Sequence, residues 1–291
     1  MPEEDDVWDY IRPVVVAVVV VLLLLTGMYL YTGNWPPLVV VESGSMQHSS
    51  SYAYLGDLNI GDVVMVKKVT SSSQVRTYID GEASGYSTYG EFGNVIIYRP
   101  YGSYSTTPII HRAIVYIEYN TTGGGYDVPS LSRLPASQWY VLTPAGKSHD
   151  VYNIRYNIVI NDVGYTHGPV IIPISNFVGR ANYSGFITMG DHNHALYGEN
   201  ATDQALGIFP VPVKAQWLNG IAVGELPYVG LIKLELSGGL PAGTPSNSVY
   251  ALVVILTAIV TVPIASEMLW SYWKENWSKG SKEKKRKEGS D

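Results

Sequence analysis

The feature that most constrains this chain is an apolar run from Val14 to Tyr31 that contains no charged residue. As an α-helix these 18 residues would be about 27 Å long, close to the hydrocarbon thickness of a bilayer. The flank before the run is acidic, the run is longer than the apolar part of a secretory signal peptide, and no Ala-x-Ala site follows it. We therefore predict a retained membrane-spanning helix over residues 14–33.

A second apolar run, at residues 249–265, contains Pro263, which membrane-spanning helices tolerate. Three tryptophans follow between residues 270 and 277, where an interfacial aromatic belt would lie. The chain then ends in a tail rich in Lys and Arg. These features favour a second span over residues 249–270, followed by a basic tail over 271–291, and disfavour a buried core helix.

The distribution of charge predicts the orientation of the two spans. Basic segments that flank a span stay in the cytoplasm, and two spans bring the acidic N-terminus, residues 1–13, to the same side. The region between the spans then faces outward, where Asn120, Asn182 and Asn200 are possible glycosylation sites. The tail directly follows an apolar run, so it indicates a membrane anchor and we expect no nucleic-acid partner.

The outer region is predicted to be mainly β. Short β-branched runs recur in it, bounded by turn residues, and long helical periodicity is absent. Residues 121–168 are rich in Gly, Tyr, Ser and Asn and are interpreted as an inserted β-rich subdomain. The core domain then comprises residues 34–120 and 169–240, with Tyr228–Leu236 as its last strand and residues 241–248 as a linker into the second span.

Three polar clusters in the outer region could carry chemistry. The chain contains no cysteine, which excludes disulfides, thiolate zinc sites and a cysteine nucleophile. A serine becomes a nucleophile only beside a base, and candidates are Ser45, in a Ser-Gly-Ser-Met segment, and His111, in an apolar strand. Strand alternation places His111 on the same face as Ile109 and Ala113.

The third cluster is Gly190-Asp191-His192-Asn193-His194. A carboxylate here could orient a histidine, and Asp203, twelve residues after Asp191, could do the same. The two histidines with Asp191 also suggest a metal site, although no zinc motif accompanies them.

In their order along the chain these segments resemble the type I signal peptidases, and in particular the archaeal and eukaryotic-type branch. The resemblance covers about residues 36–235, without the insertion. It rests on the segments Ser43-Gly44-Ser45-Met46, Gly61-Asp62-Val63-Val64, Ile110-His111-Arg112-Ala113-Ile114, Gly190-Asp191-His192-Asn193 and Val223-Gly224-Glu225-Leu226-Pro227-Tyr228-Val229-Gly230.

The resemblance implies a signal-peptidase-like coiled β-sheet and a serine endopeptidase that removes signal peptides from exported preproteins. It implies Ser45 as nucleophile, His111 as general base, and Ser43 with the Ser45 backbone N–H as oxyanion donors. The family has an aspartate soon after its Gly-Asp-Asn-Asn motif, whereas here the next one is Asp203. We expect Asp203 to be the triad acid and Asp191 a supporting residue.

No metal or other cofactor is expected. The expected partners are preproteins, the lipid bilayer and, as a further candidate, the protein translocation channel. Two alternatives stay open at this point. One is a non-catalytic membrane-anchored surface protein that binds through its β-rich domain. The other is a related membrane serine protease with a different substrate.

Overall fold

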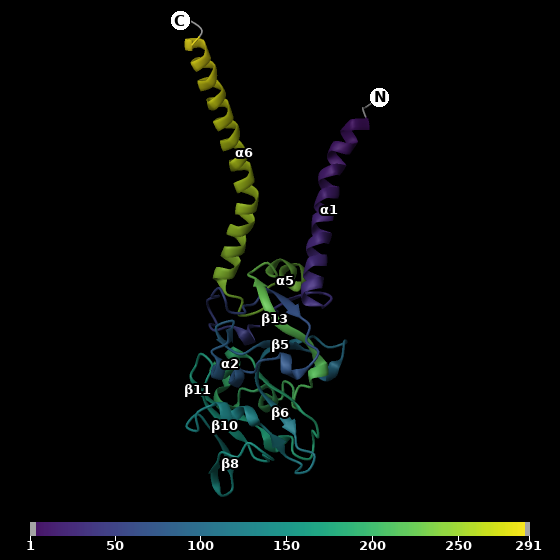
Figure 1. Cartoon of the computed structure of the whole chain (residues 1–291), viewed down its shortest axis with the longest axis vertical. Coiled ribbons are helices and arrows are strands. Elements are labelled where there is room, and N and C mark those ends of the chain that lie inside the picture. The colour runs from purple at the N-terminus through teal and green to yellow at the C-terminus, as the bar shows by residue number, and fades with distance from the viewer. Residues whose placement is uncertain (1–3, 289–291) are drawn as a thin grey trace.

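The computed structural model describes residues 4–288. The protein has a β-rich body, and two long helices leave this body at one end (Figure 1). Residues 1–3 of the predicted N-terminal segment and residues 289–291 of the predicted basic tail lie outside the described residues. The α-helices are α1 (Glu4–Thr32), α2 (Tyr78–Ser84), α3 (Asp191–Tyr197), α4 (Asp203–Leu206), α5 (Leu231–Gly238) and α6 (Ser246–Glu288).

Strands dominate the region between α1 and α6, as predicted, and they pair antiparallel throughout. They are β1 (Leu38–Val40), β2 (Val63–Lys67), β3 (Ser87–Thr88), β4 (Glu91–Phe92), β5 (Val95–Tyr98), β6 (Ile109–Tyr119), β7 (Tyr126–Asp127), β8 (Trp139–Thr143), β9 (Gly146–Ser148), β10 (Ile158–Val163), β11 (Gly168–Ile172), β12 (Gly185–Met189) and β13 (Leu218–Leu226).

The main sheet has the strand order β1-β2-β13-β5-β6-β12, with β7 paired to β6. Its central strands are rich in Val and Ile, and Val64, Val95 and Ile97 are completely buried. Because β1 stands first in this order, one of its edges has no paired strand among the described residues. The sheet thus presents an open edge at its N-terminal strand.

A second, four-stranded sheet, in the order β11-β10-β8-β9, lies at the end of the body away from the long helices (Figure 1). It spans residues 139–172, so the boundary predicted at residue 168 falls inside it. Strand β11 pairs with β10, with Ile158 opposite Ile172, and this hairpin assigns residues 168–172 to the insertion. The subdomain shares a core with β6 and β12 through residues such as Val115, Ile160 and Ile187.

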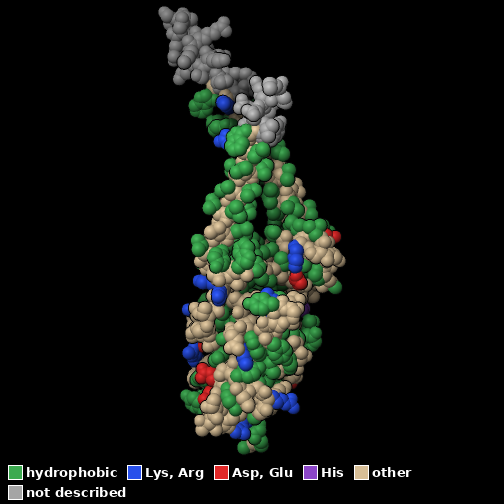
Figure 2. All heavy atoms as spheres, turned by 90° about the vertical axis from the view of Figure 1, so that its right-hand side faces the viewer, with side chains coloured by type: hydrophobic (Ala, Val, Ile, Leu, Met, Phe, Trp, Pro, Cys, Tyr) green, Lys and Arg blue, Asp and Glu red, His purple; other side chains and the backbone are tan. Residues whose placement is uncertain are grey.

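The two long helices have apolar surfaces that the protein itself does not bury (Figure 2). Segments Ile11–Thr32 and Ser246–Lys274 are both long and apolar enough to cross a membrane, and they are 0% and 6% buried. A core helix would be largely covered, so these helices need an apolar environment outside the protein. Pro263 lies within α6 without ending it.

One predicted strand is wrong. Residues 231–238 form helix α5, whereas the last core strand was predicted at Tyr228–Leu236. The helix buries Leu231 and Leu234, which are three positions apart and therefore lie on one helical face. They pack on Ile60 and Tyr228 near the start of α6. The last strand of the main sheet is β13, which ends before this helix.

Two of the segments that carried the family resemblance meet at Asp62, which is 1% exposed. Its carboxylate accepts hydrogen bonds from the backbone N–H groups of Tyr228 and Asn59, at 2.9 and 2.7 Å. Burial raises the pKa of Asp62 to about 6 in spite of these bonds. Asp62 therefore ties the loop before β2 to the segment that follows β13.

We expect Glu225→Gln to stabilise the fold at alkaline pH. Burial and repulsion by Asp62 raise the pKa of Glu225 to about 7. A carboxyl with a raised folded-state pKa favours folding in its protonated form, so its ionisation lowers the free energy of unfolding as the pH rises from about 4.5 to about 7. Glutamine removes this penalty and keeps an oxygen that can accept from the Gly56 N–H.

Thermal unfolding of both proteins in the same detergent, measured from pH 4 to pH 8, checks this prediction. At pH 8 the variant should be more stable by about 1 kcal/mol, after allowance for the half-buried position of the side chain. At pH 4 the two proteins should unfold together. A constant difference at every pH would show that ionisation of Glu225 is not the cause.

Candidate active site

Ser45 lies in a short 3-10 turn, η1 (Gly44–Met46), which residues 41–43 join to the end of β1. Met46 anchors this turn in the core, with 1% exposure, while Ser45 stays half-buried. The turn therefore holds a serine hydroxyl at the surface on a fixed backbone.

His111 lies on β6, across the cleft from Ser45. Strand alternation decides on which face of β6 its side chain lies. Ile109 and Ala113 pack into one core with Tyr98, whereas Ile110 packs into another with Met46. The predicted faces of this strand are thus confirmed. His111 is 4% exposed, and one edge of its ring faces Ser45.

Three side chains predicted as site residues meet in one hydrogen-bonded line. The Ser45 hydroxyl lies 2.9 Å from Nε2 of His111, in position to donate to it. Nδ1 of His111 lies 2.7 Å from both carboxylate oxygens of Asp203. The carboxylate fixes the proton on Nδ1, which leaves Nε2 free to accept the serine proton.

Asp203 is the first residue of α4, and its carboxylate is completely buried. Besides His111 it accepts hydrogen bonds from the Tyr98 hydroxyl at 2.9 Å and the Thr188 hydroxyl at 2.6 Å. Burial alone would raise the pKa of Asp203, but attraction to His111 and the hydrogen bonds outweigh burial and lower it. The group therefore stays ionised at neutral pH.

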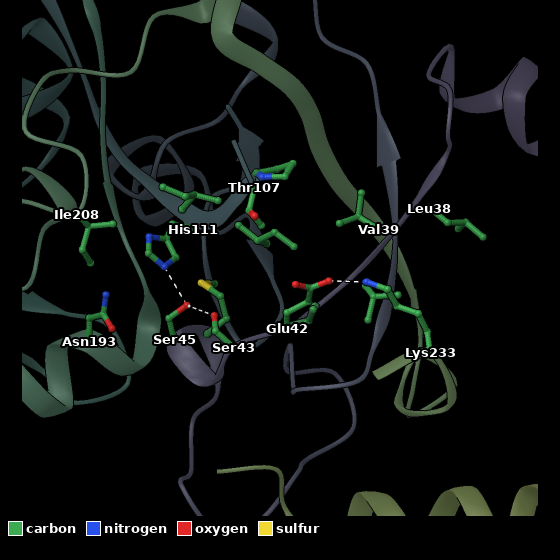
Figure 3. Close-up of a pocket in the computed structure, with 16 residues that line it drawn as sticks. Leu38, Val39, Glu42, Ser43, Ser45, Thr107, His111, Asn193, Ile208 and Lys233 are labelled. Atoms are coloured by element: carbon green, nitrogen blue, oxygen red, sulfur yellow. Dashed lines mark hydrogen bonds and ion pairs between the residues drawn. The ribbon is translucent and has the colours of Figure 1, made fainter. Parts of the chain in front are cut away.

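Ser45 and His111 open into a cleft of about 700 Å³. One wall is β1 with residues 41–43, and the other is the Thr107–His111 segment (Figure 3). The lining is largely apolar, and an ion pair between Lys233 and Glu42 lies at the end away from His111. The Ser43 hydroxyl lies 3.2 Å from that of Ser45, so both serines face the cleft.

Asp191 does not contact His111 and instead anchors a buried charge cluster beside the site. Arg112 binds it in a bidentate manner, with Nε 2.8 Å from Oδ1 and Nη2 2.6 Å from Oδ2. His48 lies between Asp191 and Asp57, at 3.3 and 3.2 Å. Burial would raise the pKa of Asp191, but Arg112 and then His48 lower it. Asp191 thus fixes the start of α3 next to β6.

The histidines of the 191–194 segment point in different directions, and among the described residues no cluster of three His, Asp or Glu side chains could hold a metal ion. His192 contacts the hydroxyl of Tyr165, at 3.1 Å. His194 contacts the Thr166 hydroxyl at 2.6 Å and donates to the Pro169 carbonyl. Both histidines therefore attach α3 to the inserted subdomain.

Sequence reasoning missed four supporting residues: Tyr98, Thr188, Arg112 and His48. Each of the four acts through a partner that lies far away in the sequence. Only His48 offered a local signal, because it is an ionisable residue three positions after the candidate nucleophile. It stacks on Tyr165 of the insertion, with ring centres 4.6 Å apart.

No family model matches the chain, and no curated protein matches it.

Proposed function

We propose that this protein is a membrane-bound serine endopeptidase that removes N-terminal signal peptides from exported preproteins. The observation that carries the proposal is the line Ser45–His111–Asp203, with contacts of 2.9 and 2.7 Å. This arrangement supplies a nucleophile, a base and an orienting carboxylate, which together are the requirements of acyl transfer.

In the proposed reaction, Ser45 Oγ attacks the scissile carbonyl carbon while its proton passes to Nε2 of His111. The carbonyl oxygen becomes an oxyanion, for which the Ser43 hydroxyl and the Ser45 backbone N–H are candidate donors. His111 returns the proton to the leaving amine, and water then hydrolyses the acyl-enzyme by the same route. Asp203 stabilises the imidazolium in both steps.

An extended peptide is the substrate that the cleft suits best. Strand β1 lines the cleft and has one edge without a paired strand in the described chain, so a peptide segment could add to it through backbone hydrogen bonds. The apolar lining favours uncharged side chains next to the scissile bond. These features support cleavage of a peptide and not of a small ester.

The position of the cleft relative to the long helices supports a membrane-inserted substrate. Strand β1 begins six residues after α1 ends at Thr32, and α1 and α6 leave the body at the same end (Figure 1). With the basic tail in the cytoplasm, both termini lie on that side and the body lies outside the cell membrane. A signal peptide spanning the same bilayer would then present its end to Ser45.

The test is cleavage of a preprotein by the purified full-length chain in lipid vesicles, with the products identified by mass. The expected result is one cut directly after the signal peptide, with small residues before the scissile bond. Cleavage of another membrane protein, with the preprotein left intact, would show that the protein is a serine endopeptidase with a different substrate. Absence of cleavage of either class by the folded protein would overturn the proposal.

A further inference from the structure

Asn193, in the cluster at the start of α3, has an amide nitrogen without a partner. The residue is 5% exposed, and its Nδ2 has no hydrogen-bond partner among the described residues. Its backbone N–H is satisfied by the Gly190 carbonyl, so only the side chain is left over. An unpaired buried donor costs about 1–3 kcal/mol, and such a group calls for a function.

This amide lies at the candidate catalytic centre. Asn193 lines the same cleft as Ser45 and His111. Gly190 packs between these groups: a Cβ added there would lie 2.9 Å from His111 Nε2 and 3.0 Å from Asn193 Nδ2. The same Cβ would lie 2.6 Å from the Ser45 carbonyl. Only glycine fits at position 190. Because glycine has no side chain, the start of α3 can lie directly against Ser45.

The two polar side chains that flank Ser45 lie on opposite sides of it. In Figure 3 Ser43 lies toward β1 and the Lys233–Glu42 pair, whereas Asn193 lies on the other side, near Ile208. In the proposed reaction His111 protonates the leaving amine, and His111 lies on the Asn193 side of Ser45, so the residues before the scissile bond would lie on the other side, along β1. The residues after the scissile bond would then leave the cleft past Asn193 and Ile208.

We infer that Asn193 is a substrate-binding residue for the leaving-group side, and this inference rests on the proposed peptidase function. Its Nδ2–H donates to the backbone carbonyl of the first residue after the scissile bond. Rotation about the last side-chain bond, a broad torsion in asparagine, turns the amide into the cleft. The substrate carbonyl supplies the acceptor that the protein lacks, and it aligns the leaving amine with His111.

Two substrates distinguish this role from a general effect on the site. One is a peptide that continues for several residues after the scissile bond. The other ends at the scissile bond with a chromogenic aniline, which has no backbone carbonyl on the leaving side. In both, Ser45 must break an amide bond, so any effect that acts through the triad changes both rates equally.

We expect Asn193→Ala and Asn193→Leu to lower kcat/KM for the long peptide by about tenfold, the value of one lost hydrogen bond. The rate on the anilide should stay within about twofold of the wild type by the same reasoning. The unfolding temperature of Asn193→Leu should equal or exceed that of the wild type, because an unpaired polar group has been replaced by an apolar one. His192→Ala, a neighbour on α3 that contacts Tyr165, is the matched control, and it should leave the ratio of the two rates unchanged.

Equal losses on both substrates would overturn the inference, because Asn193 would then act through the triad. Unchanged rates on the long peptide would overturn it as well. If the wild-type protein cleaves neither substrate, the proposed peptidase function fails first, and that result is recognised before any Asn193 variant is measured.

Discussion

Ser45→Ala is expected to lower kcat for preprotein cleavage by about 10⁵-fold or more, the scale on which triad nucleophiles act. The Ser45 hydroxyl lies 2.9 Å from Nε2 of His111, so alanine removes the proposed nucleophile and leaves the backbone turn in place. Measurement of the initial rate of mature-protein formation in vesicles, with the protein amount matched by immunoblot, checks this prediction.

Ser43→Ala is the matched control, because it removes a second hydroxyl from the same cleft. Loss of an oxyanion donor costs about 10²-fold or somewhat more, so this variant should keep measurable activity. His111→Ala should resemble Ser45→Ala, and the double variant should lose little further, since the two side chains act as one unit. Full activity of Ser45→Ala together with an inactive Ser43→Ala would show that Ser43, and not Ser45, is the nucleophile.

Local patterns explain what the sequence could predict. A membrane-spanning helix needs a continuous apolar segment, so hydropathy alone locates α1 and α6. The side of β6 on which His111 lies follows from alternation, because β6 pairs on both sides and cannot slip by one residue without exposing its core face. The strand predicted at Tyr228–Leu236 is wrong because residues 231–238 bury Leu231 and Leu234 on one helical face.

The rest of the candidate site depends on contacts between distant segments. Asp191 and Asp203 are both buried carboxylates in the segment that follows β12, and spacing could not say which one faces His111. Asp203 does so because the Thr202–Met189 bridge holds the start of α4 against β12. Arg112, the residue after His111, points to the other face of β6 and binds Asp191. Neighbouring positions on one strand thus bind different aspartates: His111 contacts Asp203 and Arg112 binds Asp191.

This division predicts that the two aspartates respond differently to the same substitution. Asp203→Asn should lower kcat by about 10³- to 10⁴-fold, because the amide N–H would face Nδ1 of His111 and favour the tautomer that carries its proton on Nε2. That tautomer cannot accept from Ser45. The asparagine oxygen can still accept from Tyr98 and Thr188, so the folded state should survive.

Asp191→Asn should lower the stability of the fold and change kcat little. The substitution leaves the Arg112 guanidinium buried without a carboxylate, which costs about 3 kcal/mol or more of unfolding free energy. The activity per folded molecule should change far less than in Asp203→Asn, because Asp191 does not contact His111. Denaturant unfolding and kcat, measured side by side on both variants, separate the two roles. A large loss of kcat in Asp191→Asn with normal stability would mean that the carboxylate behind His111 is not Asp203, and the orientation of the imidazole would need another source.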